Sequence, residues 1–159
     1  MRLWLKFYQK EDGIAAIEGA LLFPMLTVIG FGVVDTSILM MQTHQLRTGL
    51  GTAGNYLSRT VNPEVLENRA KQIAISGKFD PNASPYIKDM TPADILITYR
   101  NVPNPETDGL RDYRGGDTVR IVNLSGATEY KGIGILKIIT GGNLSVAGQY
   151  ETRLIGAAL

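Results

Sequence analysis

The fold of this chain is decided by residues 14–34, which read IAAIEGALLFPMLTVIGFGVV. Glu18 is the single charged residue in this stretch, and apolar residues return after Asp35 as far as Met41. A transmembrane helix needs about 20 mainly apolar residues to cross about 30 Å of hydrocarbon. The stretch is long enough, so we predict a transmembrane helix over residues 14–41.

The residues in front of this segment predict its orientation. Arg2, Lys6 and Lys10 precede it, and a basic flank tends to stay on the cytoplasmic side of the membrane. A cleavable secretory signal has a shorter apolar core, of about 7 to 15 residues, followed by a small-residue cleavage site. The length of this segment and the carboxylate of Glu18 disfavour that alternative. We therefore expect a single-pass membrane protein with a cytoplasmic N-terminus.

Composition excludes several classes of function. The chain has 159 residues, a net charge of +1, no cysteine and one histidine, His44. Beside the anchor there is room for one small domain of about a hundred residues. Neither a disulfide framework, nor a familiar zinc or thiol site, nor a nucleic-acid-binding surface is indicated. The acidic residues of the 106–117 loop lack the spacing of a calcium site. We expect no metal, no cofactor and no enzymatic activity.

Glu18 requires an explanation, because an ionised carboxylate deep in a bilayer costs about 3 kcal/mol on insertion scales. In one interpretation it lies a single helical turn inside the span, at headgroup depth. In the other, a cut after Gly13 makes Ile14 a free amino terminus. The Glu18 carboxylate then pairs with the α-amine of an adjacent subunit. Spacing alone leaves both interpretations open.

Three short motifs in this region point to a family. Residues 13–18, GIAAIE, follow a short basic leader and resemble the type IV prepilin signature. Residues 18–24, EGALLFP, are similar to the Glu-x-Ala-Leu-x-x-Pro pattern of TadE-like minor pseudopilins of the tight-adherence (Tad/Flp) pilus system. Residues 30–35, GFGVVD, resemble the acidic ending of that family's span. Gly19 occupies the position where major pilins of this system have tyrosine, which argues against a major subunit.

The resemblance implies a prepilin leader over residues 1–13, cut between Gly13 and Ile14 by a prepilin peptidase. It also implies that Glu18 sets axial register among neighbouring pilins and the pilus assembly machinery. The chain is expected in the bacterial inner membrane, with its head in the periplasm or outside the cell, and possible incorporation into the pilus. Pro24 predicts a kink, since proline removes a helix hydrogen bond; an ordinary kinked anchor is the alternative.

The remaining residues predict a helical extension over 42–60 and an extracytoplasmic head over 61–159. Glycines in the extension indicate a local kink or a close approach of helices. An amphipathic helix is predicted to begin with Asn62 as its cap, to have Val65 on its apolar face and to end at Gly77. Residues 94–102, 118–124 and 143–152 are typical of strands, with a polar loop over 103–114. Residues 133–139 form a packed element or a membrane-proximal segment. The predicted fold is α+β, with about three antiparallel strands.

Three classes of function follow from this pattern. A minor pseudopilin that acts by packing is the leading hypothesis. The alternative is an uncleaved single-pass envelope protein whose head binds a ligand or a partner. A membrane-bound hydrolase is a weaker third, because no nucleophile, base and orienting group can be assembled from the motifs.

Overall fold

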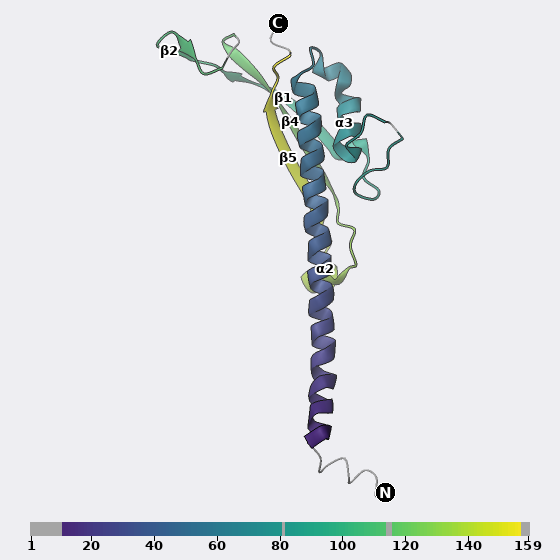
Figure 1. Ribbon diagram of the computed structural model, residues 1–159. Coiled ribbons are helices and arrows are strands. Elements are labelled where there is room, and N and C mark those ends of the chain that lie inside the picture. Colours follow the sequence, from purple (N-terminus) through teal and green to yellow (C-terminus); the bar gives the residue numbers. More distant parts are fainter. Residues whose placement is uncertain (1–10, 81, 114–115, 157–159) are drawn as a thin grey trace, which may run out of the picture. The chain divides into compact units, whose positions relative to one another are not determined.

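The computed structural model describes residues 11–80, 82–113 and 116–156 (Figure 1). Arg2, Lys6, Lys10 and most of the predicted 1–13 leader lie outside these residues. One helix, α2 (Glu11–Ser58), contains both the predicted membrane segment and most of the predicted extension. The two segments thus form one continuous helix, as predicted; the membrane crossing and its direction stay predictions.

Two compact units make up the fold, and α2 contributes to both. The first unit contains the chain up to Ile38 together with the segment Gly132–Gly142. The second contains Leu39–Lys131 and the residues from Asn143 onwards. The short helix α4 (Ile135–Thr140) belongs to the first unit, and the sheet belongs to the second. Residues 133–139, whose structure the sequence left open, thus contribute most of a helix.

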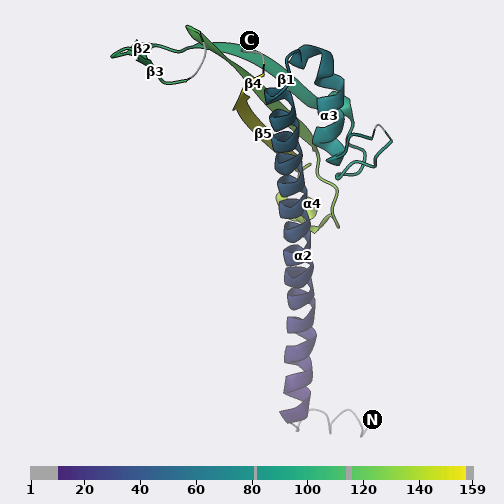
Figure 2. The same cartoon turned by 45° about the horizontal axis from the view of Figure 1, so that its top comes forward.

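The second unit is built on a three-stranded antiparallel sheet in the order β1-β4-β5. Its strands are β1 (Ile95–Pro103), β4 (Thr118–Glu129) and β5 (Ser145–Arg153). Each strand corresponds to one predicted from alternating apolar and polar residues, and β4 extends five residues further than expected. Figure 2 shows the sheet alongside the C-terminal half of α2. The predicted α+β class is confirmed.

The C-terminal half of α2 packs on one face of this sheet. Leu46, Leu50 and Leu57 are at most 1% exposed. Gly126 and Gly148 form a cross-strand pair beneath them. A Cβ atom built on Gly148 would lie 3.2 Å from Leu50 Cδ1. Because these two glycines have no side chains, the helix packs close to the sheet, as tight core packing requires.

Two glycines of α2 lie at close contacts, Gly49 with the helix that contains Ala74 and Gly54 with strand β5. A Cβ atom on Gly49 would lie 2.0 Å from the carbonyl oxygen of Ala74, and one on Gly54 would lie 2.6 Å from Tyr150 Cδ1. Neither contact leaves room for a methyl group. Of the two interpretations of these glycines, close approach is the one that the packing supports.

The predicted amphipathic helix begins later than its sequence indicates. The first turn is a 3-10 helix, η1 (Pro63–Leu66), and the α-helix is α3 (Glu67–Ser76). The expected cap at Asn62 makes no side-chain hydrogen bond, and Val65, assigned to the apolar face, is 80% exposed. This part of the prediction is wrong because the tighter 3-10 turn rotates side chains away from the 3.6-residue pattern. A further 3-10 turn, η2 (Pro92–Asp94), precedes β1.

The expected polar loop over 103–114 contains a small hairpin of β2 (Glu106–Thr107) and β3 (Leu110–Arg111). Its Asp108–Gly109 turn has positive φ at both residues, 55° and 76°, which is the turn chemistry that joins paired strands. Asn104 is 1% exposed and closes the base by donating to the carbonyl oxygens of Tyr113 and Gly116. The sequence contained this Asp-Gly signal, and the loop prediction missed it.

Candidate membrane and assembly site

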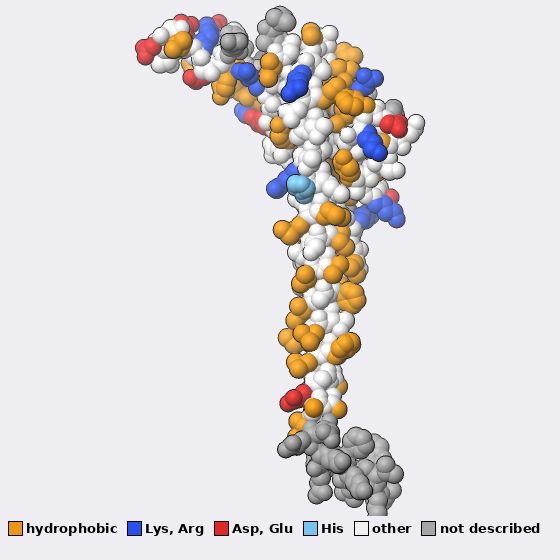
Figure 3. Space-filling view, viewed as in Figure 1, with side chains coloured by type: hydrophobic (Ala, Val, Ile, Leu, Met, Phe, Trp, Pro, Cys, Tyr) orange, Lys and Arg blue, Asp and Glu red, His pale blue; other side chains and the backbone are white. Residues whose placement is uncertain are grey.

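The N-terminal half of α2 presents apolar side chains on every side. Between Ile14 and Val34 its large apolar residues are between 48% and 73% exposed. Figure 3 shows hydrophobic side chains along this part of the helix, with charged side chains mainly over the head. Within the described part of the chain, α2 is the one helix long and apolar enough to cross a membrane. The chain is therefore a candidate single-pass membrane protein.

Hydroxyl side chains in this half are satisfied within the helix. Thr27 Oγ1 donates to the carbonyl oxygen of Phe23 at 2.8 Å, and Thr36 Oγ1 donates to that of Gly32 at 2.8 Å. Such bonds let a polar group enter a bilayer without an unsatisfied donor. The polar residues of the segment are thus compatible with lipid.

The proposed cleavage residues lie at the beginning of α2. Gly13 and Ile14 fall in its first turn, and Glu18 follows Gly13 by five positions, a rise of about 7.5 Å. The Glu18 side chain is exposed. No hydrogen bond or ion pair joins it to another residue described by the structure. A partner in a neighbouring chain and a place at headgroup depth both agree with this arrangement.

Pro24 lies in the interior of α2, which continues on both sides of it. Proline has no N–H group, so the carbonyl oxygen of Ala20 lacks its usual helical donor. Membrane helices tolerate this loss when nearby groups or neighbouring helices compensate. The kink expected at Pro24 stays a prediction.

Asp35 is the buried carboxylate of this region, with 0% exposure. Its Oδ1 accepts a hydrogen bond from the backbone N–H of Ile133 at 2.9 Å, and its Oδ2 accepts one from Leu136 at 2.8 Å. Leu136 lies in the first turn of α4, and Ile133 lies just before the N-cap residue Gly134, which provides no side-chain cap. Asp35 therefore caps α4 from a different helix. Figure 2 shows α4 beside α2.

The sequence identified Asp35 only as the acidic end of the span. An isolated acidic residue inside an otherwise apolar pattern is a signal that a partner exists, because a buried charge needs one. The pattern could not show that the partner is a backbone 98 positions away.

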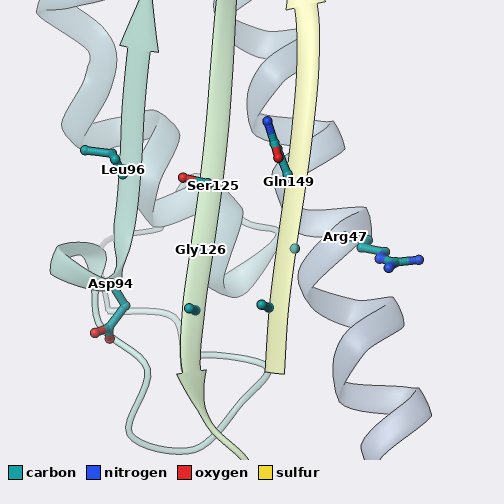
Figure 4. Close-up of a pocket in the computed structure, with 9 residues that line it drawn as sticks. Arg47, Asp94, Leu96, Ser125, Gly126 and Gln149 are labelled. Carbon is teal, nitrogen blue, oxygen red and sulfur yellow. The ribbon is translucent and has the colours of Figure 1, made fainter. Parts of the chain in front are cut away.

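The head has an open depression of 540 Å³ on the sheet face opposite α2. Figure 4 shows Leu96, Ser125 and Gln149 lying across the three strands there. The two charged residues that line it, Arg47 and Asp94, lie on opposite sides of it. Among the residues that the structure describes, no group of three or more His, Asp or Glu side chains could hold a metal ion. The depression offers a mixed surface, in which polar and charged side chains lie beside Leu96, alanines and glycines.

Comparison with known families supports the N-terminal motifs. Residues 13–53 match the family model described as TadE-like protein. The match begins at Gly13 and includes Glu18, Pro24 and Asp35. It confirms the resemblance over that stretch and implies a Tad pilus-related function, with an association with pilus machinery in general. No curated protein and no solved structure matches the chain.

Proposed function

We propose that this chain is a minor pseudopilin that is processed by a prepilin peptidase between Gly13 and Ile14 and takes part in assembling a Tad/Flp-type pilus. The observation that carries the proposal is the TadE-like match over residues 13–53. It coincides with an apolar helix half whose side chains are left exposed. The role is structural rather than catalytic.

The position of the cut supports processing. The bond between Gly13 and Ile14 lies in the first turn of α2, where N–H groups have no intrahelical partner and the helix frays. A peptidase in the inner membrane can therefore reach it from the cytoplasmic side. Until assembly, the mature chain stays in the membrane with its head in the periplasm or outside the cell.

Packing against neighbouring pilin helices supplies the mechanism. The exposed apolar side chains of α2 need a surrounding that is not water. Cβ atoms built on Gly30 and Gly32 would meet nothing within 4 Å, and small residues allow membrane helices to come close. At low dielectric, the Glu18 carboxylate then attracts the Ile14 amine of the next subunit and sets the axial register.

The open depression on the sheet supports a second candidate, an uncleaved envelope protein whose head binds a ligand or partner. It has the same topology as the pseudopilin, so membrane location does not distinguish the two. The state of the N-terminus does.

Mass spectrometry of the intact protein from native membranes is the decisive experiment. A chain that begins at Ile14, with or without a methylated amine, supports the pseudopilin. An intact Met1 form in cells with an active prepilin peptidase would contradict it and favour the binding protein.

Two substitutions separate processing from assembly. Gly13→Ala should slow the appearance of the Ile14 form, because the methyl group alters the residue at the cut. Glu18→Ala should leave processing intact and impair pilus assembly, and Glu18→Gln should do the same if charge sets the register. Normal assembly of both Glu18 variants would rule out the register mechanism.

A further inference from the structure

The segment Gly132–Gly142 of the first unit exposes a group of apolar side chains. Ile138 is 78% exposed, Ile139 is 64% and Ile133 is 52%. Lys137 is the one charged residue of the segment. We propose that this segment contacts the membrane: its isoleucines insert into the interface of the outer leaflet, and Asp35 holds it there against α2. The proposal rests on α2 crossing the bilayer and not on processing or pilus assembly.

The position of Asp35 along α2 sets the depth of the segment. Asp35 follows Ile14 by 21 positions, a rise of about 32 Å at about 1.5 Å per residue. The hydrocarbon core is about 30 Å thick. With Ile14 at the inner boundary, Asp35 therefore lies at the outer one. Its hydrogen bonds to Ile133 and Leu136 keep the segment at the same depth.

The two hydrogen bonds also explain why the segment is helical at this depth. α4 has six residues, and an isolated helix of that length is unstable. Unsatisfied N–H groups at a helix N-terminus are costly where water is scarce. The Asp35 carboxylate satisfies one of these groups, the N–H of Leu136, and also accepts from the N–H of Ile133, which lies just before the helix. The partial positive charge at a helix N-terminus favours an anion there. One contact thus both caps α4 and fixes it to the anchor.

Lipid is the occupant that the surrounding surface favours. Val33 and Val34, which directly precede Asp35 on α2, are 61% and 48% exposed, so apolar side chains are exposed on the anchor next to the residue that holds the segment. Apolar side chains beside a basic residue are typical of elements that lie in the membrane interface. Water around Ile138 and Ile139 would leave this surface unburied, which the hydrophobic effect opposes.

The absence of cysteine from the chain permits a direct test. Single-cysteine variants of the full chain carry an NBD fluorophore and are reconstituted in phosphatidylcholine–phosphatidylglycerol vesicles, with or without brominated lipid. Ile138→Cys reports on the segment and Leu22→Cys on the span. Val65→Cys is a matched control, because Val65 is 80% exposed against 78% for Ile138 but lies in the second unit.

Brominated lipid should quench the probe at Ile138 several-fold more strongly than the probe at Val65, with emission shifted to the blue. Adding Asp35→Ala should reduce quenching at position 138 and leave it unchanged at position 22. Equal, weak quenching at positions 138 and 65 would overturn the proposal. A blue shift at position 138 that depends on the protein-to-lipid ratio and not on brominated lipid would also overturn it, because it would indicate that a second copy covers the segment. An unquenched probe at Leu22 would remove the anchor and the proposal with it.

An unchanged signal at Ile138 in the Asp35→Ala chain would overturn the role of Asp35. These vesicles contain neither peptidase nor pilus components. A failure here is therefore distinct from a failure of the proposed processing, which the mass of the native N-terminus reports.

Discussion

The two halves of α2 share one continuous helical backbone but differ in what surrounds their side chains. In the C-terminal half, Leu46, Leu50 and Leu57 are buried, and Leu46 and Leu50 lie against glycines of the sheet. In the N-terminal half, Leu22 and Phe23 are 55% and 73% exposed. Both halves are rich in apolar residues, so hydrophobicity alone does not distinguish them.

The difference shows that one helix can have two sources of stability. The C-terminal half is stabilised by apolar area buried within the chain, at about 25 cal/mol per Å². Under the proposed function, the N-terminal half obtains that stabilisation from molecules outside the chain, either lipid or neighbouring helices. Substitutions in the first case should change the stability of the head, and substitutions in the second should change insertion or assembly.

Leu50→Ala should have the largest effect on head stability. Leu50 is 0% exposed, and truncating a buried leucine typically costs about 2–5 kcal/mol. Leu22→Ala is the control in the other half and should leave the unfolding of the head unchanged. Urea unfolding of the detergent-solubilised chain, followed by circular dichroism, measures both. Equal effects of the two substitutions would remove the distinction between the halves.

Gly49→Ala should have the next largest effect on the stability of the head. It should destabilise the head, whereas helix propensity alone predicts stabilisation. Propensity alone favours alanine by about 1 kcal/mol, but the added methyl group would meet the Ala74 carbonyl oxygen. We expect a net loss of about 1–3 kcal/mol, as for overpacked cores. Gly51→Ala, whose Cβ would lie 3.6 Å from Tyr150 Cε2, should be neutral or stabilising. Stabilisation by both substitutions would contradict the close approach.

Asp35→Ala should destabilise the structure locally, at the contact between α2 and α4. Loss of a helix cap costs about 1 kcal/mol, which corresponds to an open population about fivefold larger. Hydrogen exchange at the Ile133 and Leu136 amides measures it. Asp35→Asn keeps one carbonyl oxygen as an acceptor and should show a smaller increase in hydrogen exchange. Unchanged exchange at both amides would show that the cap adds no protection.

Glu64→Gln should have the smallest effect, and one that depends on pH. Backbone hydrogen bonding and then the Arg120 guanidinium hold the pKa of the Glu64 carboxyl below its usual value of 4.5. A carboxyl group whose pKa is lower in the folded state stabilises the fold at pH values above its unfolded-state pKa. That stabilisation is lost as the pH falls through its folded-state pKa.

The difference in Tm between wild type and Glu64→Gln should therefore be present at pH 7 and shrink on acidification. The pair is exposed, so added salt should weaken it. Glu18→Gln, in the membrane half, should leave the Tm of the head unchanged. A difference that grows as pH falls would contradict the assigned sign.

Local pattern was sufficient for much of the fold. The length of the apolar run predicted the membrane helix, and period-two alternation predicted the strands, because both depend on residues close together in the chain. The pattern failed at Asn62, where a 3-10 turn replaces the expected cap. It also failed over 103–114, where the Asp108–Gly109 turn pairs two short strands.

The residues of the candidate site also separate into those that local sequence predicts and those that depend on packing. The roles of Gly13, Ile14, Glu18 and Pro24 could be predicted from sequence because they depend on fixed spacing along one helix, and they stay predictions. The cap that Asp35 provides for α4 could not be predicted, since carboxylate and amides are 98 positions apart. Likewise, the role of the α2 glycines in close packing is visible only from their contacts with Ala74 and Tyr150. Contacts between distant segments depend on how the elements pack, and periodicity within each element carries no information about that packing.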